Sequence, residues 1–110
     1  MKILDIYLES LNQSDLSNKL SKYKVITFKT DEDIRKGLLK YDKLPLGKCF
    51  LFILPYEQLG DFHTIGMKFN IDIYFYDKNG KIDSYKLDIK PGMKSIKSKG
   101  KVKYIVEIPK

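Results

Sequence analysis

The side chains best suited to chemistry are few, because the chain has one histidine, one arginine and one cysteine among its 110 residues. The histidine lies in a predicted loop, residues 62–67, just before a predicted strand, and loops often carry binding residues. Side chains in and near this segment could form a polar pocket for a small anion or a peptide. They are Arg35, His63, Thr64, Met67 and Asp72.

A structural interpretation competes with this pocket. Arginine binds a carboxylate through a planar fork that lysine lacks, and Arg35 is the sole arginine of a chain with net charge +7. Among the candidate site residues, Asp72 carries the carboxylate that could accept this fork from Arg35. An Arg35–Asp72 ion pair would tie a helix to a strand and brace the 62–67 loop. Pocket, ion pair and separate solvated side chains stay open as alternatives.

An enzyme of unknown class, using His63, Asp72 and Arg35, is an alternative to a binding or accessory module. Nucleophilic catalysis needs a nucleophile beside a base, and Cys49 with His63 is one conceivable pair. Cys49 lies within an apolar run, where burial would raise its pKa and leave it a structural thiol. The sequence therefore leaves enzymatic activity undecided and favours a binding module.

No metal or cofactor site is expected. Segment 77–82 resembles the middle of a calcium-binding loop, but aligning Gly80 with the turn glycine places Phe75 and Lys86 where oxygen ligands are needed. A β-hairpin turn is the better interpretation of these residues. The single cysteine excludes a cysteine-rich zinc site, and the sequence has no glycine-rich loop of the phosphate-binding kind.

A run of lysines near the C-terminal end has two interpretations. It could be a solvated loop and strand edge, where lysine also prevents edge-to-edge pairing. It could instead contact the phosphates of nucleic acids without sequence preference. The run lacks interleaved aromatic side chains for base stacking, which favours the first interpretation. Its members are Lys94, Lys97, Lys99, Lys101 and Lys103.

Hydrophobic periodicity predicts the elements that would position these residues. The run 48–54 is apolar on both faces, so it should be a central strand that ends at Pro55, with a loop over 55–65. Thr30 should cap a helix that carries Arg35, and Ser14 should cap a shorter helix. Strands are expected over residues 2–8, 25–28, 48–54, 69–76, 81–89 and 102–108.

The dipeptide Asn79-Gly80 predicts a hairpin turn between the strands 69–76 and 81–89, with a bulge at residues 83–84. Residues 94–100 should form a basic loop before the last strand. These elements predict an α+β fold, with a mostly antiparallel, strongly curved or partly closed β-sheet and one or two short helices. A chain of 110 residues fits a single domain.

Several segments together resemble the family known as DUF192. Residues 62–75 and the hairpin 77–82 are similar to its central motif. Upstream, residues 35–39 read Arg-Lys-Gly-Leu-Leu, which resembles a helix motif of the family. Downstream, the turn 90–92 and the closing segment 106–109 resemble its proline turn and its last strand. No single element is specific, but their order and spacing are.

The resemblance covers about residues 24–109 and has some departures. Asn70 and Leu39 stand where proline and methionine are usual, and the chain stops at Lys110, where many members continue. The resemblance implies a fold and no activity, because the family has no agreed biochemical function.

The N-terminal segment predicts where the protein resides. Asp5 and Glu9 fall where a signal peptide needs an unbroken apolar stretch, and no window approaches the roughly 18 apolar residues of a membrane span. We therefore expect a cytoplasmic protein that does not contact membranes. Its lysine-rich composition is typical of hyperthermophile proteins, and also of AT-rich genomes.

Overall fold

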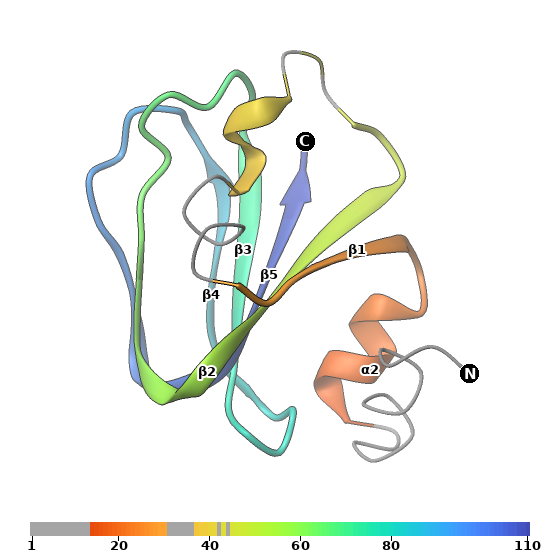
Figure 1. Ribbon diagram of the computed structural model, residues 1–110, viewed down its shortest axis with the longest axis vertical. Coiled ribbons are helices and arrows are strands. Elements are labelled where there is room, and N and C mark those ends of the chain that lie inside the picture. The colour runs from red at the N-terminus through yellow and green to blue at the C-terminus, as the bar shows by residue number, and fades with distance from the viewer. Residues whose placement is uncertain (1–13, 31–36, 42, 44) are drawn as a thin grey trace.

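A computed structural model describes residues 14–30, 37–41, 43 and 45–110 (Figure 1). Its elements are α2 (Asp15–Leu20), β1 (Lys24–Phe28), the 3-10 helix η1 (Gly37–Lys40), β2 (Lys48–Phe62), β3 (Ile71–Tyr76), β4 (Ile82–Ile89) and β5 (Ile96–Pro109). The strands form one sheet in the order β1-β2-β5-β3-β4. The predicted strand 2–8, and residues 31–36 of the helix expected after Thr30, lie outside the described residues.

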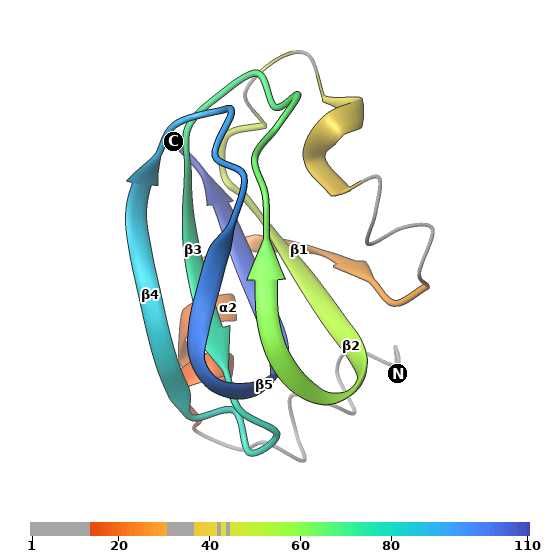
Figure 2. The same cartoon turned by 90° about the vertical axis from the view of Figure 1, so that its left-hand side faces the viewer.

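The fold is mostly β with a short helix, as expected, but the sheet is mixed and open. β1 pairs with β2 in parallel, whereas the other three neighbouring pairs are antiparallel. A parallel pair needs a long crossover connection, and residues 29–47 supply it. β1 and β4 are the two edges of the sheet, so it is not closed. Its curvature is strong, since β2 and β5 bend together at one end (Figure 2).

β2 is much longer than predicted, and the loop expected over residues 55–65 is wrong for residues 55–62 and confirmed only for residues 63–65. Pro55 is exposed, and the pairing of β2 with β5 shifts between Ile53 and Gln58. The missing amide of proline is therefore tolerated where the ladder is interrupted, and the strand bends instead of ending. The part of β2 that follows the bend packs closely against the side chain of Phe75 in β3. A Cβ atom added to Gly60 would lie only 2.8 Å from the Phe75 ring.

The predicted basic loop over 94–100 is also wrong over most of its length. β5 begins at Ile96, which pairs with Phe62, and Lys97 pairs with Asp61. The end of β2, which the sequence predicts to be a loop, is therefore the strand partner of residues 96 and 97. Backbone pairing between distant segments decided both boundaries.

The β3–β4 hairpin and the short helix are confirmed. Gly80 has a positive φ of 79° in the turn. Phe75 pairs with Ser84 and Tyr76 pairs with Ile82, so the bulge lies at residue 83 as predicted. Ser14 caps α2, because its hydroxyl accepts a hydrogen bond from the Ser17 amide at 3.1 Å.

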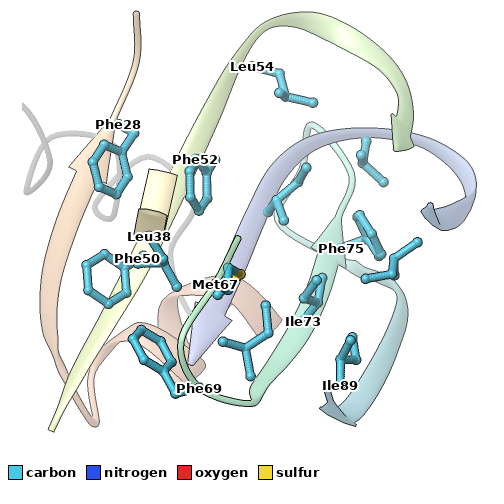
Figure 3. Close-up of a cluster of buried hydrophobic side chains, with 14 residues drawn as sticks. Phe28, Leu38, Phe50, Phe52, Leu54, Met67, Phe69, Ile73, Phe75 and Ile89 are labelled. Carbon is cyan, nitrogen blue, oxygen red and sulfur yellow. The ribbon is translucent and has the colours of Figure 1, made fainter. Parts of the chain in front are cut away.

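Alternating residues of β2 enter two apolar clusters, which explains why the run 48–54 is apolar on both faces. Phe50 and Phe52 belong to the main cluster, with Phe75 of β3 (Figure 3). Leu51 belongs to the second cluster on the opposite face, which α2 covers with Leu16 and other side chains. Between β1 and β5, β2 is an interior strand, as predicted.

Cys49 is fully buried in the second cluster. Burial raises the pKa of its thiol to about 12, and the nearby Lys19 charge opposes this in part. The prediction of a structural thiol is confirmed. None of the helices in the described part of the chain has the length and apolar character needed to cross a membrane.

Candidate functional site

Thr64, in the predicted 62–67 loop, hydrogen-bonds this loop to the turn at residues 90–93. Its buried hydroxyl donates to the Lys90 carbonyl at 2.8 Å and accepts from the Met93 amide at 2.9 Å. Its backbone amide donates to the Met93 carbonyl, and its carbonyl accepts from the Gly92 amide, both at 2.9 Å. Thr64 thus bonds to the turn through both its hydroxyl and its main chain.

The loop does not present its predicted site residues on one surface. Met67 is 6% exposed and packs in the main cluster, whereas the His63 side chain is exposed. The centroid of the His63 ring lies 6.3 Å from that of Phe62. Arg35 lies outside the described residues, so a pocket that includes it stays a prediction.

The Asp72 carboxylate binds the backbone near the C-terminal end of β4. Its Oδ1 accepts a hydrogen bond from the Asp88 amide at 2.7 Å and lies 3.5 Å from the Lys110 ammonium. Asp88 is the non-glycine residue with a positive φ, 54°, among those described, and its carboxylate accepts from the Asn70 side-chain amide at 3.0 Å. Asp72 therefore stabilises a strained bulge. The Arg35–Asp72 ion pair stays a prediction, because Arg35 is not described.

A different group of residues forms a groove of about 300 Å³ between α2 and the β3–β4 hairpin. Tyr74 and Tyr85 are paired across β3 and β4, and their rings stack with centroids 5.8 Å apart and planes inclined by 24°. The Lys19 ammonium lies 4.1 Å from the centroid of the Tyr74 ring. Asn18 and Lys22 also line this groove, which we call the tyrosine–lysine groove.

Local contacts hold the two walls of the tyrosine–lysine groove together. The Leu16 amide donates to the Gly80 carbonyl at 2.9 Å, and the Asp15 carboxylate accepts from the Ile82 amide at 2.8 Å. Leu16 and Leu20 bury the opposite side of α2 in the second cluster. The helix is thus attached to the hairpin at its first turn, and this fixes its polar side beside the tyrosines.

The electrostatics of the groove favour anions. Lys19 and Lys22 bring two positive charges to the lining and Asp15 brings one negative charge, so the positive charges exceed the negative one. The Asp15 carboxylate is directed to the Ile82 amide. Burial, followed by Tyr74 and Asp15, raises the pKa of the Tyr76 phenol at the base of the groove, which therefore stays neutral. The site can offer aromatic surface, two ammonium groups and an amide.

Sequence reasoning missed this groove, although two signals for it were present. Lys19 lies in the last turn of the short helix capped at Ser14, and Lys22 follows two residues after that helix ends. The Asn79-Gly80 turn with a bulge at residue 83 also sets Tyr74 opposite Tyr85. Only the docking of α2 against the hairpin brings these two sets together.

The predicted lysine run lies mostly on β5. Lys97, Lys99 and Lys101 are exposed at alternate positions of the strand, and we call these three the lysine ribbon. The amides of Lys99 and Gly100 each donate to the Asp83 carboxylate at 2.9 Å. The exposed Lys94 lies in the preceding turn.

The fifth lysine of the run, Lys103, donates from its ammonium to the Leu54 carbonyl. This contact links β5 to the end of the apolar part of β2, so Lys103 is less available for a ligand than the lysine ribbon. Among the residues that the structure describes, no group of three or more His, Cys, Asp or Glu side chains could hold a metal ion.

Glu107 is a further unusual group, and sequence reasoning did not single it out. It is fully buried in β5 between Phe50 of β2 and Ile73 of β3, two members of the main cluster. Neither carboxyl oxygen has a hydrogen-bond partner among the residues that the structure describes. Burial raises the pKa of this carboxyl well above its usual range, so a neutral carboxylic acid is favoured in the fold.

The fold is similar to that of two solved structures. A protein of unknown function from Novosphingobium aromaticivorans superimposes with a TM-score of 0.74 at 16% identity, covering 79% of this chain and 63% of its own. A protein from Sinorhizobium meliloti, provisionally described as a transcription regulator, superimposes with a TM-score of 0.72 at 17% identity, covering 77% of this chain and 67% of its own. This chain therefore spans less than two thirds of the first neighbour.

No curated protein matches the sequence. The model of the DUF192 family, described as Uncharacterized ACR, matches residues 13–110, which is nearly the whole chain. The match also includes α2, Lys19 and Lys22, all of which precede the segments that carried the sequence resemblance. On this match, the chain belongs to the DUF192 family.

Proposed function

We propose that this domain is a binding module, and that its ligand is an anion carrying a flat ring, bound in the tyrosine–lysine groove. The observation that carries the proposal is the stacked pair Tyr74–Tyr85 with Lys19 over one ring. Tyr85 is 59% exposed and keeps open ring surface. Lys22 stands exposed at the rim.

Each part of the groove supplies a different element of recognition. Aromatic rings stack on other flat rings, and lysine ammonium groups pair with phosphate or carboxylate as point charges. The volume, about 300 Å³, is at the small end of ligand sites. A net charge of +7 also raises the local concentration of anions around the domain.

Nuclear magnetic resonance tests the proposal, because a chain of 110 residues is well suited to amide spectra. We expect adenosine monophosphate to shift the amide signals of Lys19, Lys22 and Tyr85 together and to saturate. Adenosine alone and inorganic phosphate alone should each bind more weakly, since each lacks one half of the recognition.

Two variants and a matched control make this test specific. Tyr85→Leu removes the ring and keeps an apolar side chain, and Lys22→Gln removes one charge; both should weaken binding. Lys97→Gln removes one charge from the lysine ribbon and should leave binding unchanged. Saturating shifts confined to His63 and its neighbours would contradict this proposal and support the site predicted at the 62–67 loop.

A further inference from the structure

We infer that the tyrosine–lysine groove binds single-stranded nucleic acid, an inference that rests on the function proposed above. The groove alone is large enough for little more than one nucleotide. Exposed lysines near both of its ends extend the positive charge beyond the tyrosine pair. This arrangement suits a polyanion with flat rings along its length better than an isolated nucleotide.

The contacts of α2 place these lysines. The first turn of α2 bonds to Gly80 and Ile82 of the hairpin, so the exposed Lys81 between them lies at that end of the groove. The exposed Lys22 follows the other end of α2. At about 1.5 Å of rise per helical residue, the two ends are separated by roughly 10 Å. Lys19 and the tyrosine pair lie between them.

The acidic side chains close to this track, Asp15 and Asp77, keep their negative charge, but each directs an oxygen to backbone amides of the hairpin. Asp77 accepts hydrogen bonds from the amides of Asn79 and Lys81, both at 2.9 Å. Asp15 accepts from the Ile82 amide. Both carboxylates are thus bonded to the backbone of the hairpin, whereas the lysines at the two ends extend into solvent.

The tyrosines favour a single strand over a duplex. In a duplex the bases are stacked and paired inside the helix, so their faces are not accessible to a side chain. In a single strand any base can stack on an aromatic ring, and the backbone phosphates can follow lysines on either side. The lysine ribbon also carries three lysines, but the residues between them, Ser98 and Gly100, are not aromatic. It therefore provides a matched comparison.

Fluorescence anisotropy with labelled oligothymidine and oligouridine of about twelve nucleotides tests the inference. Two triple variants each remove three positive charges: Lys19, Lys22 and Lys81 to Gln in the groove, and Lys97, Lys99 and Lys101 to Gln in the ribbon. We expect the groove variant to lose binding and the ribbon variant to retain it. Tyr85→Leu should weaken binding about tenfold, from the stacking energy of one base.

The salt dependence gives a second readout. If three lysines contact phosphates, the logarithm of affinity should fall with a slope of about −2 against the logarithm of salt concentration. This corresponds to about a 20-fold loss between 50 and 200 mM salt. Lys22→Gln should reduce the slope by about 0.7. The unchanged amide spectrum of Tyr85→Leu away from residue 85 would verify that this exposed position does not disturb the fold.

Several results would overturn the inference. Equal losses in the two triple variants would indicate attraction by net charge alone, and a loss only in the ribbon variant would move the site to β5. Equal affinity for a duplex would exclude base stacking. Shifts of groove amides by adenosine monophosphate, without tighter binding of either oligonucleotide, would refute this inference and leave the proposed function intact. Binding of only the deoxyribose or only the ribose strand would support it and identify the sugar.

Discussion

Replacing Glu107 by glutamine should stabilise the domain at neutral and alkaline pH, and the gain should disappear in acid. The carboxyl is fully buried beside the main cluster, and in the described part of the chain neither of its oxygens has a hydrogen-bond partner. Glutamine has nearly the same shape but no ionisable group. The difference between the two proteins therefore isolates the free energy of ionising this one carboxyl.

The sign and slope follow from the direction of the pKa change. Burial raises the pKa of the folded carboxyl well above the usual value of 4.5. Below that usual value the carboxyl is protonated in both states and contributes no pH dependence. As the pH rises above it, the unfolded chain ionises while the folded one stays protonated, so wild-type stability falls by about 1.4 kcal/mol per pH unit. The fall ends where the folded carboxyl itself ionises.

Urea denaturation at a series of pH values between about 4 and 8 measures the difference in the free energy of unfolding between Glu107→Gln and wild type. The contributions of all other titrating groups are shared by the two proteins and cancel in this difference. The gap between Glu107→Gln and wild type should widen steadily with pH and then level off. Glu57→Gln removes a carboxyl from a more accessible position and is the matched control. A gap for Glu107→Gln that is the same at every pH would refute the claim that the folded carboxyl is neutral.

Two further predictions concern other buried groups. Thr64→Val keeps the shape of the side chain but removes the hydroxyl that bonds to Lys90 and Met93; it should lower the free energy of unfolding in urea by about 1–3 kcal/mol, and an unchanged value would show that the loop is held by its backbone bonds alone. Cys49, with a pKa raised to about 12, should not react with iodoacetamide at pH 8 in the folded protein and should react once urea unfolds it; fast labelling of the native state would contradict its burial.

Elements that depend on contacts between nearby residues agree with the prediction from the sequence, whereas strand ends that depend on distant partners do not. The Ser14 cap and the Asn79-Gly80 turn depend on residues a few positions apart, and both are confirmed. The end of β2 depends on a partner far along the chain. Pro55 removes one amide, but the pairing of Phe62 with Ile96 resumes beyond it. A local rule for proline could not anticipate a strand that bends and continues.

The site was harder to predict than the fold, for a related reason. Thr64 and Asp72 have residue types that suit chemistry, yet the structure uses them to bond backbone amides at turns and bulges. The tyrosine–lysine groove, in contrast, requires that a helix capped at Ser14 dock against a hairpin more than fifty residues later. No spacing within the sequence encodes that contact directly.

The sequence by itself determined the elements whose signals are local, the burial of Cys49, and a family resemblance carried by short motifs in order. The tertiary structure alone decided the parallel pairing of β1 with β2, the continuation of β2 past Pro55 and the isolation of Glu107 in the core. The physical reason is that capping, turn formation and alternation depend on neighbouring residues. Sheet order, burial and grooves depend instead on which distant surfaces pack together, and this is settled only by the free energy of the whole fold.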